Sequence, residues 1–155
     1  MKKKYENSLR EIIKEYNLKP KKKLGQNFLH DKNIISSIVN KANIEDEDII
    51  EIGPGPGILT ESILNNKARS LLAIEKDDSF EVNLKKIRSN YRDNFDYLIN
   101  DVIDFDFKKL TKKNYKFVSN LPYNISVPFI LKMIRIRKII PWKEMILMVQ
   151  KEVAE

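Results

Sequence analysis

Four consecutive residues, Asn120-Leu121-Pro122-Tyr123, follow an apolar run and carry groups suited to chemistry on a nucleobase. The exocyclic nitrogen of adenine is a poor nucleophile because its lone pair is delocalised into the ring. If the Asn120 side-chain oxygen and the Leu121 carbonyl accept its two hydrogens, that lone pair is localised toward an incoming methyl group. Pro122 would stiffen the loop, and the Tyr123 ring would stack on the unstacked base. Taken alone, the tetrapeptide also fits an ordinary Asn-x-Pro turn after a strand.

A glycine-rich loop, Gly53-Pro54-Gly55-Pro56-Gly57, lies between a predicted strand and a predicted helix. Glycine lets the backbone approach a ligand closely, and the following helix N-terminus favours polar or anionic groups. Ile58 breaks the dinucleotide fingerprint, and no Gly-Lys-Ser/Thr follows as a Walker loop requires. With Glu51 the loop reads E-x-G-x-G-x-G, the version associated with S-adenosylmethionine, and Gly53 and Gly55 are its expected cofactor contacts. A tight structural turn is the alternative for the loop alone.

Two acidic residues follow at the ends of the next two predicted strands. Glu75 follows Gly53 by about 20 residues, the spacing at which dinucleotide-binding folds place a carboxylate on ribose hydroxyls. Asp101 follows the third strand, where a carboxylate would accept the adenine amino group of the cofactor. Asp77 and Asp78 are close in sequence, but only Glu75 ends its strand.

The elements that position these residues read as strands alternating with helices. Strands without polar alternation indicate a parallel sheet covered on both faces. We therefore predict an α/β fold, a Rossmann-like parallel sheet flanked by helices. The predicted strands are 48–52, 71–74, 95–99, 115–119 and 144–149, the last one central in the sheet; the predicted helices are 5–17, one capped by Asp31, 58–64, 80–91 and 127–136.

The net charge of +7 is concentrated at the N-terminus. Residues 1–23 hold nine Lys/Arg and three Asp/Glu, whereas the remainder is nearly balanced. We predict that 1–23 form a basic helix and linker, and that 24–155 form the cofactor-binding domain. A basic arm suits a nucleic-acid partner, because phosphate contacts supply sequence-independent affinity. A solvated tail is an equally good interpretation of the charge alone.

The composition excludes several classes of site. The chain has no cysteine and one histidine, His30, so we expect no metal and no covalent thiol intermediate. No run approaches the roughly 20 apolar residues of a membrane helix, and the basic start does not lead into an apolar signal segment. We expect a cytoplasmic, monomeric protein. His30 is interpreted as a surface or capping residue, and Trp142 as core packing.

Five motifs in order resemble the bacterial small-subunit (16S) ribosomal RNA adenine N6,N6-dimethyltransferase family. The resemblance covers the chain from about residue 20 to its end, and the motifs are Gly25-Gln26-Asn27-Phe28-Leu29, Glu51-Ile52-Gly53-Pro54-Gly55, Ala73-Ile74-Glu75, Asn120-Leu121-Pro122-Tyr123-Asn124-Ile125-Ser126 and Gln150-Lys151-Glu152-Val153-Ala154. It implies a class I S-adenosylmethionine methyltransferase fold and dimethylation of two adjacent adenosines of 16S ribosomal RNA in the immature small ribosomal subunit. It also implies cofactor contacts at Asn27, Leu29, Gly53, Glu75, Asp101 and Asn120.

The chain departs from the family pattern in two places. Pro56 stands where the family usually carries a bulkier apolar or a small residue. Residues 150–155 read as a helix that has only begun, so we expect truncation before the last strands and the C-terminal helical RNA-binding domain. Such a part is expected to bind cofactor and to methylate RNA weakly or not at all.

Three other functions remain open. Large-subunit ribosomal RNA adenine methyltransferases and DNA adenine N6-methyltransferases use the same chemistry on other targets. A non-catalytic ribosome assembly factor would use the basic arm and would not need Asn120.

Overall fold

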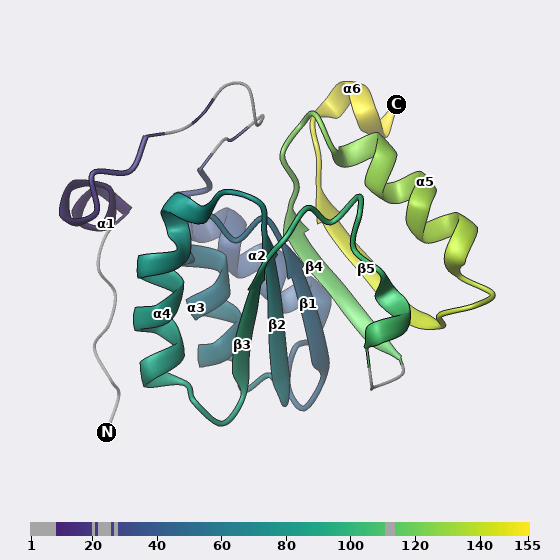
Figure 1. The fold of residues 1–155 in the computed structure, drawn as a ribbon, viewed down its shortest axis with the longest axis horizontal. Helices are drawn as coiled ribbons and strands as arrows, with labels where there is room; N and C mark the ends of the chain where they lie inside the picture. Colours follow the sequence, from purple (N-terminus) through teal and green to yellow (C-terminus); the bar gives the residue numbers. More distant parts are fainter. Residues whose placement is uncertain (1–8, 20, 22–25, 27, 111–113) are drawn as a thin grey trace.

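The computed structural model describes residues 9–19, 21, 26, 28–110 and 114–155. They form one five-stranded sheet in the order β3-β2-β1-β4-β5, and every adjacent pair of strands is parallel. This confirms the predicted Rossmann-like α/β fold (Figure 1). The strands are β1 Asp48–Ile52, β2 Ser70–Glu75, β3 Phe95–Ile99, β4 Tyr115–Asn120 and β5 Trp142–Met148.

The buried strand β1 shows why its sequence lacks polar alternation. All five of its residues are buried. Ile49 packs into the core on one face of the sheet, whereas Ile50 and Ile52 pack into the core on the other. A strand covered on both faces needs apolar side chains on both.

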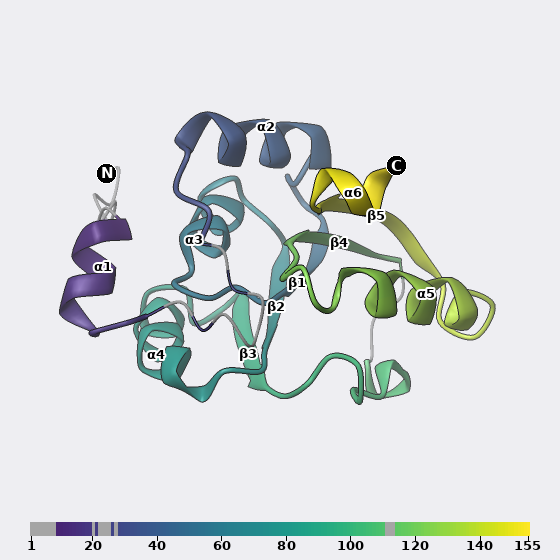
Figure 2. The same ribbon diagram turned by 90° about the horizontal axis from the view of Figure 1, so that it is seen from above.

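Helices cover the two faces of the sheet (Figures 1 and 2). Apolar residues of α2, α3 and α4 form one core, and those of α5 and the β3–β4 connection form the other. Asp31 caps α2 as predicted, because its Oδ1 accepts hydrogen bonds from the N–H groups of Asn33 and Ile34 at 2.8 and 3.3 Å. The helices are α1 Leu9–Glu15, α2 Lys32–Ala42, α3 Ile58–Asn65, η2 Asp78–Phe80, α4 Glu81–Asn90, η3 Phe107–Lys109, α5 Ser126–Ile136 and α6 Lys151–Ala154.

The last strand differs from the prediction in position. β5 begins at Trp142 rather than Glu144, and within the described residues it pairs only with β4, at the sheet edge. The prediction of a central strand was therefore wrong for the described sheet. An apolar run shows that a strand is covered, but it does not show whether a second strand lies beside it.

The N-terminal arm is packed on the body where the structure describes it. The predicted helix 5–17 is observed as α1, while residues 5–8 lie outside the described part. Ile12 and Leu18 are buried in a small core with Phe80. The interpretation of a solvated tail is therefore wrong for this stretch.

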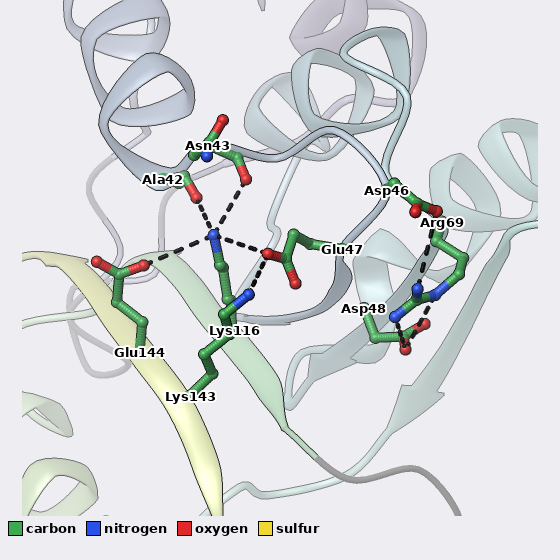
Figure 3. Close-up of polar contacts among 9 residues, drawn as sticks. All are labelled: Ala42, Asn43, Asp46, Glu47, Asp48, Arg69, Lys116, Lys143 and Glu144. Atoms are coloured by element: carbon green, nitrogen blue, oxygen red, sulfur yellow. Dashed lines mark hydrogen bonds and ion pairs between the residues drawn. The ribbon is translucent and has the colours of Figure 1, made fainter.

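A buried lysine joins α2 to the base of the sheet (Figure 3). Lys116 of β4 is 4% exposed, and its Nζ donates to the carbonyls of Ala42 and Asn43 at 2.8 and 3.1 Å. The same ammonium lies 3.2 Å from Glu47 Oε1 and 3.7 Å from Glu144 Oε2. These contacts satisfy the carbonyls at the end of α2 and fix it against β4.

No helix in the described residues is long and apolar enough to cross a bilayer.

Candidate active site

A cavity opens at the carboxyl ends of the strands, above the point where the strand order reverses between β1 and β4. Open α/β sheets bind ligands at this position. The empty space between its lining atoms is about 870 Å³ with the open mouth included. It is lined by Gln26, Phe28, Leu29, Glu51, Ile52, Gly53, Pro54, Gly55, Pro56, Ile58, Leu59, Ile74, Glu75, Lys76, Phe80, Asn100, Asp101, Val102, Asn120, Pro122, Asn124 and Ile125.

The glycine loop forms the floor of the cavity. Gly53 has a φ of +66°, and its N–H donates to the Ile74 carbonyl at 2.9 Å, which ties the loop to β2. A Cβ at Gly53 would lie 3.2 Å from Pro122 Cδ. The glycine loop and the Asn-Leu-Pro-Tyr loop are therefore in direct contact beside the cavity.

Glu75 ends β2 inside the cavity and is buried. Its Oε2 accepts a hydrogen bond from the Gly55 N–H at 3.0 Å, and its Oε1 accepts one from the Asp77 N–H at 2.8 Å. Burial raises the pKa of Glu75, and these backbone donors oppose the shift. The carboxyl group is thus fixed in orientation at the cavity.

Asp101 lies at the third strand end as predicted, but it has a partner that the sequence did not indicate. Lys76 Nζ donates to Asp101 Oδ2 at 2.6 Å, and the Ile103 N–H donates to Oδ1 at 2.9 Å. Partial burial raises the pKa of Asp101, but these two hydrogen bonds outweigh it and the pKa is lowered. Asp101 is therefore an ionised acceptor at the cavity wall.

The Asn-Leu-Pro-Tyr loop is divided between cavity, core and solvent. Asn120 and Pro122 line the cavity. The side chain of Leu121 is buried in the core, and its N–H donates to the Met148 carbonyl at 3.1 Å. Tyr123 is 50% exposed and lies outside the cavity lining, on the solvent side of the loop.

The segment before α2 forms one wall. Gln26, Phe28 and Leu29 line the cavity, whereas the predicted contact Asn27 lies outside the described residues. Phe28 packs edge-on against Phe80 with ring centroids 5.7 Å apart. This packing supports the interpretation of a loop with a core phenylalanine, whereas the cofactor cover stays a prediction. His30 is exposed, consistent with a surface residue.

Glu51 is a buried acid of the site, and no separate role was predicted for it from the sequence. It is 1% exposed and lines the cavity, and Thr60 Oγ1 donates to its Oε2 at 2.7 Å. Burial raises the pKa of Glu51 to about 8, against the effect of the Thr60 hydrogen bond. Its place in the E-x-G-x-G-x-G pattern was the available signal.

The described lining fits S-adenosylmethionine better than a dinucleotide. Three carboxyl groups, those of Glu51, Glu75 and Asp101, face one ammonium group, that of Lys76. Because Lys76 is paired with Asp101, no unpaired cation among the described lining residues is available for a pyrophosphate. The acids at the ends of β2 and β3 would hold the ribose and the adenine amino group, between apolar side chains such as Ile74 and Val102.

The sheet order, the glycine loop after β1 and the acid that ends β2 define the Rossmann-like class I fold of S-adenosylmethionine-dependent methyltransferases. Residues 17–155 match the family model described as ribosomal RNA adenine dimethylase. The chain therefore belongs to that family.

Relatives of known name agree with this family. The chain is 40% identical over 152 residues to ribosomal RNA small subunit methyltransferase A of Alkaliphilus oremlandii, covering 94% of this chain and 52% of that protein. It is 39% identical over 150 residues to the protein of the same name from Rhodopseudomonas palustris strain TIE-1, covering 95% and 52%. The chain spans about half the length of these relatives.

A solved structure gives the same result for the fold. A dimethyladenosine transferase from Plasmodium falciparum is 30% identical, with a TM-score of 0.69, over 83% of this chain and 45% of that one. The resemblance stated from the motifs is thus confirmed.

Proposed function

We propose that the protein that contains this chain transfers methyl groups from S-adenosylmethionine to N6 of two adjacent adenosines in 16S ribosomal RNA, during small-subunit biogenesis in the cytoplasm. The observation that carries this proposal is that Asn120 lines the same cavity as Glu75 and Gly53. One cavity thus presents both the nucleoside-binding acid and the group suited to activate an exocyclic amine.

The roles of the residues follow from the groups they present. S-adenosylmethionine, when bound, supplies an electrophilic methyl group. The Asn120 side-chain oxygen and the Leu121 carbonyl would accept the two N6 hydrogens of the target adenine and localise the nitrogen lone pair. Tyr123, half exposed on the loop, would stack on the base extruded from RNA. Alignment of the reacting groups and exclusion of water would contribute most to the rate of methyl transfer.

The partner of this site is proposed to be the immature small subunit. Two relatives are named as small-subunit ribosomal RNA methyltransferases, which favours that target over large-subunit RNA and DNA. We propose that residues 24–155 act as the cofactor-binding domain of one monomeric enzyme, with residues 1–23 as a basic arm.

Calorimetric titration tests the cofactor part of this proposal. The wild-type chain should bind S-adenosylmethionine saturably and NAD not at all. Glu75→Ala should lose this binding, whereas Asp78→Ala should retain it, because Asp78 is an exposed acid of the same cluster. Equal binding of NAD, or retention of binding in Glu75→Ala, would contradict the assignment of the cavity.

A methyl-transfer assay tests the target. The protein that contains this chain is incubated with labelled S-adenosylmethionine and, side by side, with immature small subunits, naked large-subunit RNA or DNA. The Alkaliphilus oremlandii relative serves as a positive control. Label is expected on the small subunit and should fall by about 100-fold or more in Asn120→Ala. Label on DNA alone, or an active Asn120→Ala, would overturn the proposal.

A further inference from the structure

The acid two residues after Glu75 makes contacts that the proposed reaction does not use. The side chain of Asp77 is 1% exposed. Its Oδ1 accepts hydrogen bonds from Lys21 Nζ at 2.7 Å and from the N–H and Oγ of Ser79 at 3.1 and 2.7 Å. Its Oδ2 accepts one from Gln26 Nε2 at 2.8 Å. One buried carboxylate thus joins the end of β2 to the N-terminal segment.

Gln26 is held at both ends of its amide. Its Nε2 donates to Asp77, and its Oε1 accepts a hydrogen bond from the Lys21 backbone N–H at 2.7 Å. Gln26 itself lines the cofactor cavity. Farther along, Phe28 reaches over the glycine loop, with its ring 3.8 Å from where a Gly55 Cβ would stand. The hydrogen bonds at Asp77 are therefore placed to set the position of this cavity wall.

Asp77 also touches the cofactor site from its backbone. Its N–H donates to Glu75 Oε1 at 2.8 Å. The residue thus orients Glu75 through its backbone and Gln26 through its side chain, and both of these residues line the cavity. Burial raises the pKa of Asp77, but the hydrogen bonds from Lys21, Gln26 and Ser79 outweigh it and lower the pKa, so the group is an anion at neutral pH.

We propose that Asp77 is a positioning residue for cofactor binding, which holds Gln26 and the wall that follows it against the cavity. This inference rests on the proposed function, because it assigns the cavity to S-adenosylmethionine. It predicts that breaking the Asp77–Gln26 hydrogen bond weakens cofactor affinity, even in Asp77→Asn, where the changed residue is not part of the cavity lining.

Two single substitutions and their combination give a sharp test. In Asp77→Asn, the new amide can keep its oxygen toward Lys21 and Ser79, but its NH₂ then faces the NH₂ of Gln26. In Gln26→Glu, two carboxylates face each other. In the double variant, the new amide donates to the new carboxylate, so the hydrogen bond returns with donor and acceptor exchanged. The contacts from Lys21 and Ser79 are also kept.

Affinity for S-adenosylmethionine is measured by calorimetry. Each single variant should bind about ten-fold more weakly, and the double variant should recover to within about three-fold of wild type. Asp78 is next to Asp77 in the chain but is exposed. Asp78→Asn is therefore the matched control and should bind like wild type. Single variants with wild-type affinity, or a double variant no better than the singles, would overturn the proposal.

Amide hydrogen exchange of the ligand-free protein gives a second readout. The amides of residues 26 and 28–30 should exchange faster in each single variant and return to the wild-type rate in the double variant. If wild-type protein fails to bind S-adenosylmethionine, the proposed function fails at that point. The exchange rates still report whether Asp77 holds the wall, and unchanged rates would overturn that part.

Discussion

Pro122 packs directly on Gly53, so the glycine loop and the Asn-Leu-Pro-Tyr loop contact each other at a position where a Cβ would be tightly packed. A Cβ at Gly53 would come within 3.2 Å of Pro122 Cδ and 3.3 Å of its Cγ. Gly53 also has a φ of +66°, which other residues adopt at a cost of about 1–2 kcal/mol. This contact limits how closely the glycine loop and the Asn-Leu-Pro-Tyr loop can approach each other.

Gly53→Ala should therefore weaken binding of S-adenosylmethionine by about ten-fold or more, because the added methyl group displaces Pro122 and strains the loop. The measurement is calorimetric titration. In the Gly53→Ala/Pro122→Ala double variant, removal of the proline ring should restore part of the affinity. Equal affinities of the single and double variants would show that the contact does not matter.

A buried glutamate, Glu51, and a half-buried one, Glu61, should make stability depend on pH. Burial raises the pKa of Glu51 to about 8 and that of Glu61 to about 7, from an ordinary value of 4.5. The folded chain therefore binds more protons than the unfolded chain across this range. The stability that these groups contribute is fully present below about pH 4.5 and is lost as pH rises toward 8.

Urea denaturation between pH 5 and 8 checks this expectation. The free energy of unfolding should fall with rising pH in the wild type and fall less steeply in Glu51→Gln, which keeps an acceptor for Thr60 without a titrating proton. Glu45→Gln, an exposed substitution, should follow the wild-type slope. Parallel slopes for wild type and Glu51→Gln would contradict the burial of a protonated acid.

Lys116→Met should destabilise the fold by about 2–4 kcal/mol, because it leaves the Ala42 and Asn43 carbonyls without their buried donor. Lys143 is the matched control (Figure 3). It also pairs with Glu47, but it is 52% exposed, so Lys143→Met should cost less than about 1 kcal/mol. Chemical denaturation of both variants gives the two values, and similar losses would argue against a special role for Lys116.

Tyr123 should separate RNA methylation from cofactor binding. Because its ring lies outside the cavity lining, Tyr123→Ala should leave the affinity for S-adenosylmethionine within about two-fold of wild type. Methyl transfer to RNA should fall by about 10-fold to 100-fold, the value of one stacked base, and Tyr123→Phe should retain it. Loss of cofactor binding in Tyr123→Ala would contradict the assignment of this ring to the target base.

The sheet and its ligand edge could be predicted because their signals are local. A continuous apolar run such as 71–74 indicates a covered strand, and the acid that ends this strand falls at the same sheet edge as the glycine loop. Family motifs then supplied the substrate class. The edge position of β5 could not be predicted, since pairing depends on which other strands are present.

The contacts between distant segments could also not be predicted from the sequence. Asp77 and Asp78 look alike as neighbouring surface acids, yet only Asp77 is buried by Lys21 and Gln26. Lys76 is one of many lysines, and only the fold brings it to Asp101. Such pairings depend on the path of the N-terminal segment and of the loops between strands, for which residue type carries no periodic signal.

The cavity wall is assembled from stretches that lie far apart in the chain, around Gln26, Gly53, Glu75, Asp101 and Asn120. An unfolded chain cannot present them together, so the methyl donor is a ligand of the native state alone. At a concentration 100 times its dissociation constant, such a ligand adds about 2.7 kcal/mol to stability. We therefore expect cellular proteases to degrade this protein faster when methyl-donor metabolism is starved, so that enzyme abundance follows nutrient supply without any change in transcription.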